Sequence, residues 1–494
     1  MELQFQKTQE SCLQQLGWQI RQMEQTQELK LEDMMPDICH VLGTWGQVLI
    51  RGKEWQNDSV TVSGGVMVWV MYASEEGEDN CVKTWIPFQI RTQITPSEKD
   101  GIICAAPLLR NADARSISAR KLMVRVNISM VIQSLVPGKA EISKPERLPE
   151  DVQLLKKTYK ACLPKEAGEK AFTIDDELTL PGNCPAPSQL LRFELRPELV
   201  DQKIMADKVV FRGVGILHLV YRGQDGQVYS EDLETPFSQY AELDRIYDET
   251  AEARITPVLT SLELDLEENG RLHLKAGLLG QYVVYDRPEL ELIEDAYGTQ
   301  TQVLPQMEQL QLPIVLDQTE ETIHAQLDVE AEAMTVADIS FYPAHPEISP
   351  EGAVTLTGRF CTLYYDRDGQ LCSGSGKWNC QWDWPVDESC ALEMDVLPSG
   401  VVQSAVSADR ISLDGDLRVR ATCTGQTGLP MVTGLTIREK ESQERRPGLI
   451  IRRLGEDTLW EVAKATGSTV EGILQANGLT ETPTPDSFLL IPVK

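Results

Sequence analysis

The sequence predicts a mainly β protein in which three tandem antiparallel β-sandwich-like modules precede a small C-terminal βααβ domain. An apolar strand pattern with fixed glycine and tyrosine spacing recurs along the chain, which indicates internal repetition. Sustained 3.6-residue apolar periodicity is scarce before residue 450, so we expect strands to dominate that part. The predicted domains are residues 1–145, 146–305, 306–440 and 446–494.

Equal spacings relate the first module to the second. Gly64 precedes Tyr72 by eight residues, and Gly213 precedes Tyr221 by eight. In each copy a second glycine follows the tyrosine after five residues, within a polar segment typical of a hairpin turn. A Pro-Phe pair comes next in both copies. These later anchors are Gly77 with Pro87 and Phe88, and Gly226 with Pro236 and Phe237.

A third, more degraded copy reads LTGRFCTLYYDRDGQ. Here Gly358 precedes Gly369 by eleven residues rather than thirteen, so this core strand has lost two residues or contains a different bulge. Trp382, Trp384 and Pro385 stand near the place where the Pro-Phe pair is expected.

Residues 66–71 are apolar at both odd and even positions, a pattern typical of strands covered on both faces. The matching strand of the second module contains His218 in its middle. Because no second histidine or cysteine lies at metal-ligand spacing in the sequence, we interpret His218 as a hydrogen-bonded strand residue.

The net charge is −30, and residues 146–444 account for −28 of it, with 25 Lys and Arg against 53 Asp and Glu. An acidic surface repels phosphate groups, so nucleic acid and anionic lipid are not expected as ligands. The charge either keeps the protein soluble or faces a basic partner. Since the sequence has no GxxxxGK[ST], HExxH or GxSxG motif, we expect no enzymatic activity, no catalytic residue and no cofactor.

The 11 cysteines form no CxxC pair and only five histidines are present, so a structural zinc site has little support. Five cysteines crowd the third module at spacings that fit alternating strand positions. We expect reduced thiols, with intermolecular disulfides of a maturing assembly as the alternative. These five are Cys361, Cys372, Cys380, Cys390 and Cys423.

The N-terminal segment is polar and lacks the apolar stretch of a secretory signal. The most apolar run, residues 66–73, is far shorter than the roughly 20 residues that span a bilayer. We therefore expect a cytoplasmic protein without membrane insertion.

The C-terminal segment has the order strand, helix, helix, strand. The first strand is expected at 449–454. Thr458 with Glu461 forms a capping box that starts the first helix, and Gly467 ends it. The later signals are a second capping box at Ser468 and Glu471, a stop at Asn477 and Gly478, and a strand at 488–493. Upstream, the charged residues 438–447 predict an exposed linker.

This segment, with GEDTLWEVAKATGSTVEGILQANGL followed by LLIP, closely resembles a LysM domain over residues 447–494. In that family the loop after the first strand and the loop after the second helix line a groove for N-acetylglucosamine polymers. The resemblance therefore implies an N-acetylglucosamine-containing glycan as one candidate ligand. The candidate groove or partner contacts are Gly455, Glu456, Asp457, Thr458, Trp460, Lys464, Leu479 and Thr480.

The repeated module resembles the SPOCS domain of endospore-forming bacteria, on the motifs MMPDICHVLGTWGQV, VTVSGGVMVWVMY, the Pro-Phe pair and SISARKLMVRVNI. Several SPOCS copies followed by one LysM domain is the arrangement of the SipL-like family of spore coat morphogenetic proteins. This implies a non-enzymatic adaptor in the mother cell, at the forespore surface, whose LysM domain contacts the coat morphogenetic ATPase. The alternative is a glycan-binding protein of the cell wall or spore cortex.

Trp460 is the single aromatic residue near the expected groove and shares a helix turn with Lys464. Exposed tryptophans are frequent binding hot spots. We therefore expect the C-terminal domain to bind a protein partner more tightly than chitin or peptidoglycan oligomers. The alternative is that Trp460 packs against the linker or the third module.

Overall fold

A computed structural model describes residues 1–75, 77–95, 100–268, 270–343, 346–349, 353–382, 390–439, 448–479 and 487–493. Antiparallel strands make up most of these residues, and the helices among them are two short ones near the C-terminus. The predicted mainly β fold class is therefore confirmed. Within the described ranges, no helix is both long enough and apolar enough to cross a membrane.

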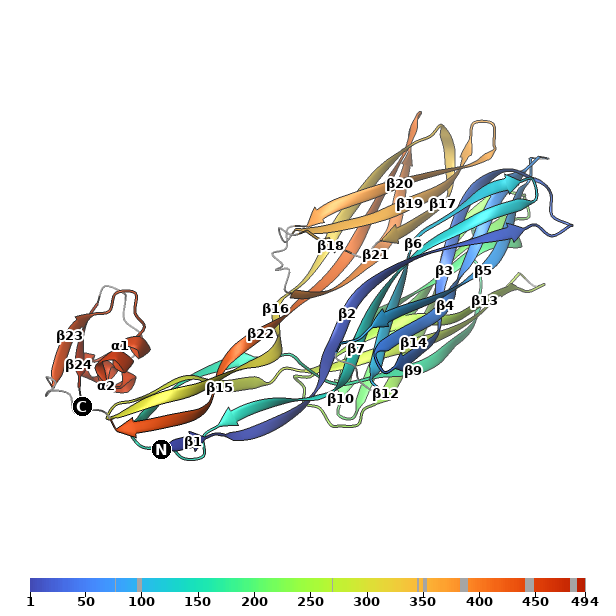
Figure 1. The fold of residues 1–494 in the computed structure, drawn as a ribbon. Coiled ribbons are helices and arrows are strands. Elements are labelled where there is room, and N and C mark those ends of the chain that lie inside the picture. The colour runs from blue at the N-terminus through green and yellow to red at the C-terminus, as the bar shows by residue number, and fades with distance from the viewer. Residues whose placement is uncertain are drawn as a thin grey trace.

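The first sandwich consists of two three-stranded sheets with the orders β2-β7-β6 and β3-β4-β5 (Figure 1). Its first strand pairs with its last, and the second, third and fourth strands form a meander. The strands are β2 (Gln6–Lys30), β3 (Ile38–Gln56), β4 (Ser59–Ser74), β5 (Asp79–Gln93), β6 (Ile102–Ser118) and β7 (Lys121–Lys144).

The second sandwich has the same plan, with the sheets β13-β14-β9 and β10-β11-β12. Its strands are β9 (Leu163–Leu178), β10 (Pro187–Met205), β11 (Lys208–Gly223), β12 (Val228–Glu242), β13 (Glu252–Leu266) and β14 (Leu272–Asp286).

The third sandwich again pairs its first strand with its last, β16 with β22, and its meander is β17-β19-β20. Strand β16 begins before residue 306, the expected start of the third module, and the predicted domain limits stay predictions. The strands are β16 (Thr301–Glu330), β17 (Ala333–Pro343), β18 (Glu347–Ile348), β19 (Val354–Asp366), β20 (Leu371–Trp382), β21 (Cys390–Val406) and β22 (Arg410–Glu439).

The first glycine of the repeated spacing lies where no side chain fits. A Cβ on Gly213 would lie 2.3 Å from the carbonyl oxygen of Glu198 and 2.4 Å from the ring of Phe237. That ring stands directly opposite Gly213 on β12. Gly64 likewise stands opposite Phe88, whose ring would lie 2.9 Å from an added Cβ. The spacing in the sequence therefore reflects an aromatic ring that lies against bare backbone of the neighbouring strand.

In the third sandwich the residue opposite the glycine is a tryptophan. Gly358 on β19 pairs with Trp378 on β20, and an added Cβ would lie 2.3 Å from the indole nitrogen. Trp382, which the sequence places near this position, lies four residues farther along β20, opposite Val354. The hairpin is two residues shorter in each strand, which keeps a ring opposite the glycine. Trp384 and Pro385 lie outside the described residues.

A narrower sandwich, which we call the stem, joins the three larger ones. It consists of β1 (Glu2–Gln4), β8 (Val152–Lys160), β15 (Glu289–Gly298), the first part of β16 and the last part of β22. Its sheets are β1-β22-β16 and β15-β8. Strands β16 and β22 run together from the stem into the third sandwich (Figure 1), with register shifts between Gln306 and Met307 and between Val315 and Asp317.

The C-terminal unit has the expected order of elements: β23 (Leu449–Arg453), α1 (Leu459–Thr466), α2 (Val470–Asn477) and β24 (Phe488–Pro492). Gly467 and Gly478 end the helices with φ values of +70° and +63°, as predicted. The expected capping box at Ser468 is wrong, because Thr469 caps α2 and accepts from Gly472 N. Ser468 Oγ instead donates to the carbonyl of Pro492 on β24. Residues 440–447 of the expected linker lie outside the described residues.

The packing around Gly213 predicts a selective loss of stability. Gly213→Ala should lower the free energy of unfolding by about 1–3 kcal/mol, because the new methyl group collides with Glu198 and Phe237. Gly182→Ala is the matched control, since a Cβ there meets nothing within 4 Å. Urea unfolding of both variants measures the difference, and equal stabilities would contradict this account of the repeat.

Candidate functional site

Strand β4 is covered on both faces, by different sandwiches. Val66, Val68 and Val70 belong to the core of the first sandwich. Met67 and Trp69 belong to the core of the second, where Trp69 meets Phe193 edge-on with 5.2 Å between ring centroids. Both faces of β4 are apolar in the sequence because one face packs in the first sandwich and the other packs against the second.

All three sandwiches meet in one apolar cluster. Its members come from β3 and β4 of the first sandwich, from β10, β11 and β12 of the second, and from β19 and β20 of the third. They are Leu42, Trp45, Met71, Ala73, Leu191, Val220, Val228, Leu363 and Leu371. Such a shared core holds the three sandwiches in one arrangement, whereas domains without a shared core move independently.

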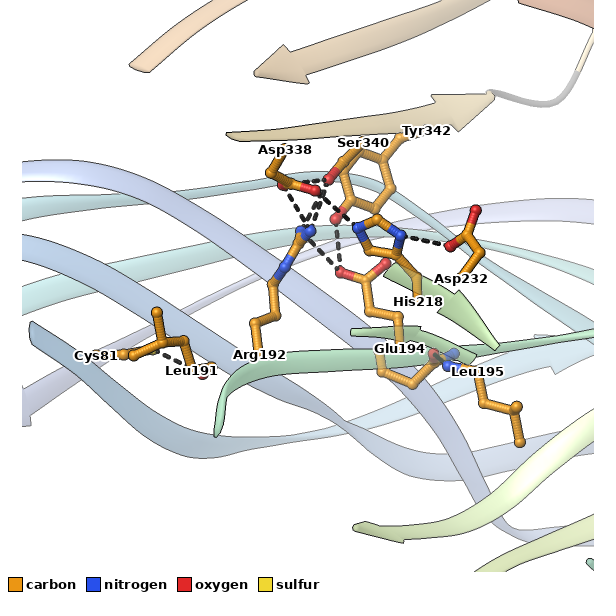
Figure 2. A network of polar contacts seen from close by, with 11 residues as sticks. Cys81, Leu191, Arg192, Glu194, Leu195, His218, Asp232, Asp338, Ser340 and Tyr342 are labelled. Atoms are coloured by element: carbon orange, nitrogen blue, oxygen red, sulfur yellow. Dashed lines mark hydrogen bonds and ion pairs between the residues drawn. The ribbon is translucent and has the colours of Figure 1, made fainter. Parts of the chain in front are cut away.

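Arg192 on β10 lies fully buried beside this cluster and contacts the other two sandwiches. Figure 2 shows its contacts with Asp338 and Ser340 of the third sandwich. Its Nη2 donates to Asp338 Oδ2 of the third sandwich at 2.8 Å, and both Nη atoms donate to Ser340 Oγ at 2.9 Å. Its Cζ lies 4.6 Å from the ring centroid of Trp45 in the first sandwich. Because a buried charge is tolerated only when it is paired and hydrogen-bonded, these contacts require one mutual placement.

His218 on β11 continues the network. Its Nε2 lies 2.8 Å from Asp338 Oδ1, and its Nδ1 lies 2.7 Å from Asp232 Oδ1. Burial lowers the pKa of His218, but the carboxylates of Asp338 and Asp232 outweigh burial and raise it to about 9. Burial raises the pKa of Asp338, yet Arg192 and His218 hold it below its usual value. His218 is a hydrogen-bonded strand residue, as interpreted from the sequence.

A cavity of about 670 Å³ opens beside this network. Its lining combines His218, Asp232 and Asp338 with apolar residues such as Leu109 and Val258. Strands of all three sandwiches contribute to the lining. Within the part of the chain that the structure describes, no cluster of three or more His, Cys, Asp or Glu side chains is arranged to hold a metal ion.

Side chains of one sandwich also satisfy the free backbone of another. The amide of Gln281 on β14 accepts from Ala105 N and donates to Ala105 O, both at 2.8 Å, on the edge strand β6. Lys53 Nζ donates to the same Gln281 at 2.8 Å and to Glu169 on β9 at 2.6 Å. At Ala105 the free edge of β6 is thereby hydrogen-bonded by a side chain in place of another strand.

The C-terminal unit docks onto the stem, and two of the predicted contact residues, Trp460 and Lys464, take part. Trp460 Nε1 donates to Asp295 Oδ2 at 2.9 Å, and Lys464 Nζ donates to the same oxygen at 2.6 Å. Tyr297 OH donates to the carbonyl of Ser468 at 2.8 Å, and its ring meets that of Trp460 edge-on at 4.8 Å. Trp460 therefore packs on β15.

The other predicted contact residues stay in the loops of the unit. Asp457 pairs with Arg452, and Thr458 caps α1 by accepting from Glu461 N at 3.2 Å. Leu479 packs partly buried against the core of the unit. Gly455 and Glu456 are exposed, Gly455 has a φ of +62°, and Thr480 lies outside the described residues.

Sequence reasoning missed Arg192, Asp338, Asp295 and Tyr297. Arg192 lies between Leu191 and Phe193, but β10 also contains Glu194 and Arg196, so the charge of Arg192 did not distinguish it in the sequence. Its partner is 146 residues away in the chain, so spacing gave no indication of the pair.

The network around His218 predicts a pH dependence of stability. The folded state raises the pKa of His218 from 6.5 to about 9, so its stabilising charge is complete below about pH 6.5 and is lost as the pH rises through 9. Wild-type protein should lose about 2–3 kcal/mol of unfolding free energy over this range, at roughly 1.4 kcal/mol per pKa unit. Denaturant titrations at pH 6.5 and pH 9 measure the loss. His218→Gln should flatten the profile, and an unchanged slope in that variant would refute the assignment.

Comparison with known families connects the second sandwich with a described domain. Residues 188–267 match the family model described as "SipL, SPOCS domain". The matched segment covers most of β10 and all of β11, β12 and β13, and thus contains Arg192, His218 and Asp232. No curated protein and no solved structure matches the chain. The match supports a SipL-like protein and suggests a sporulation-related role in protein interaction.

Proposed function

We propose that this chain is a non-enzymatic scaffold of spore coat assembly, which docks onto the coat morphogenetic ATPase at the forespore surface in the mother cell. The observation that carries the proposal is the match of residues 188–267 to the SipL, SPOCS domain. That segment supplies the arginine and histidine of the junction between the sandwiches. It is therefore a structural centre of the chain as well as the segment linked to sporulation.

The architecture supports a scaffold, because a scaffold must hold its contact surfaces at fixed positions. The buried Arg192 and the shared apolar cluster fix the sandwiches relative to one another. The continuous strands β16 and β22 extend from the third sandwich into the stem. The C-terminal unit lies at the far end of the stem, away from the three sandwiches (Figure 1).

We propose further that the C-terminal unit is a LysM domain whose main ligand is a protein. Its strand, helix, helix, strand order agrees with the motif that suggested this family. The groups that Trp460 contacts in this structure are protein side chains, the ring of Tyr297 and the carboxylate of Asp295. This supports protein recognition over the runner-up function, in which the unit binds N-acetylglucosamine polymers of the wall or cortex.

A substitution in the C-terminal unit tests this proposal. Trp460→Ala, introduced into full-length Asp295→Ala protein so that no strand contact of its indole nitrogen is lost with it, should weaken binding to the purified ATPase by roughly 30-fold relative to Asp295→Ala alone, as expected when a hot-spot tryptophan worth about 2 kcal/mol is removed. Glu471→Ala on the exposed side of α2, introduced into the same protein, is the matched control and should bind like Asp295→Ala alone. Calorimetric titration measures both affinities, and circular dichroism checks that the fold is intact.

A chain truncated after residue 445 should fail to capture the ATPase from sporulating cells. Micromolar binding of N-acetylglucosamine oligomers, unaffected by Trp460→Ala and accompanied by no affinity for the ATPase, would establish the glycan function instead.

A further inference from the structure

The surface of the C-terminal unit that contains Trp460 already holds a ligand, which is a strand of the same chain. Asp295 and Tyr297 are two residues apart on β15, and alternate residues of a strand project to the same side. One carboxylate oxygen of Asp295 accepts hydrogen bonds from both Trp460 and Lys464. Tyr297 contributes its ring to Trp460 and its hydroxyl to the backbone of Ser468.

These contacts form a matched set. Trp460 and Lys464 lie one helical turn apart on α1, so their donors converge on a single carboxylate. Tyr297 is only 4% exposed and joins the apolar core of the C-terminal unit, beside Leu459 and Val462. Burial raises the pKa of Tyr297 to about 12, so its hydroxyl keeps its proton and remains a donor to Ser468 O. The charge, the ring and the hydroxyl of the strand each have a partner on the unit.

We infer that the C-terminal unit is a receptor for an extended acidic-x-aromatic segment, and that Asp295 and Tyr297 of β15 occupy this receptor surface in the closed chain. A protein partner that uses the same surface presents the same chemistry, an Asp or Glu two residues before an aromatic, and displaces β15. The inference deepens the proposed function, and rests on it only for the identity of the partner.

Occupation in cis has a measurable consequence. A segment from another molecule must compete with β15 for this surface. Its apparent association constant is therefore the intrinsic association constant multiplied by the fraction of chains that are open. Removal of the side chains of Asp295 and Tyr297 should therefore open the surface without altering the receptor residues Trp460 and Lys464.

A peptide test decides the point with the full-length chain. The probe is a fluorescent peptide of residues 289–299, ELELIEDAYGT, and its anisotropy is titrated with three proteins. The double variant Asp295→Ala/Tyr297→Ala should bind the peptide at least ten-fold more tightly than the wild type. Adding Trp460→Ala to the double variant should abolish the gain. A control peptide with alanine in place of its aspartate should bind the opened chain at least ten-fold more weakly.

Tyr297 is buried, so the fold of the opened chain is checked by hydrogen exchange in the three sandwiches. If the double variant is unfolded, Asp295→Ala alone serves, and it should still raise the affinity for the peptide. Equal affinity of the peptide for closed and opened chains overturns the inference, as does the absence of binding to a folded, opened chain.

The ATPase then separates the two proposals. Tighter binding of the ATPase to the opened chain supports both. If the peptide binds the opened chain more tightly than the closed chain but the ATPase binds neither, the receptor surface is supported and the ATPase is excluded as its partner. An ATPase that binds closed and opened chains equally overturns the inference that the partner uses the acidic-x-aromatic surface.

Discussion

The placement of the three sandwiches depends on the buried charge of Arg192. A guanidinium with no exposed surface is tolerated only when it is paired and hydrogen-bonded, and the shortest hydrogen bonds of Arg192 go to Asp338 and Ser340 on β17 of another sandwich. Asp338 is itself buried and needs both Arg192 and His218. Any displacement of the third sandwich would leave charges of both signs unpaired in an apolar junction. The network therefore makes this placement of the sandwiches far more favourable than slightly displaced ones.

The stem is a consequence of that arrangement. Its apolar core combines the end of β7, the start of β9, strand β15 and the stem portions of β16 and β22, so all three sandwiches contribute to it. These strand ends converge only if the sandwiches are held at fixed positions. Strand β15 then presents Asp295 and Tyr297 to the C-terminal unit. The junction around Arg192 thus positions the stem, and the stem positions the side chains of β15 that the C-terminal unit contacts.

The sequence predicted the parts of the fold that local spacing encodes. The Gly-Tyr-Gly spacing located equivalent hairpins, since a ring on one strand must lie against a glycine on the next. Local signals can mislead when two neighbours offer the same chemistry: Ser468 and Thr469 are both good caps, and Ser468 is engaged by β24 and Tyr297. The contacts between the sandwiches and the existence of the stem were not predicted from the sequence. Asp295 and Lys464 are 169 residues apart, and no periodicity relates residues at such separations.

The central claim, that Arg192 organises all three sandwiches, is tested most directly by hydrogen exchange of Arg192→Met against wild type. Amide protection reports local stability strand by strand. The account predicts faster exchange in β3 around Trp45 and in β17 around Asp338, as well as in β10 itself. Arg212→Met, which removes an exposed ion pair with Asp201 on the same sheet, should leave those strands unchanged. Faster exchange confined to β10 in the Arg192 variant would contradict the claim.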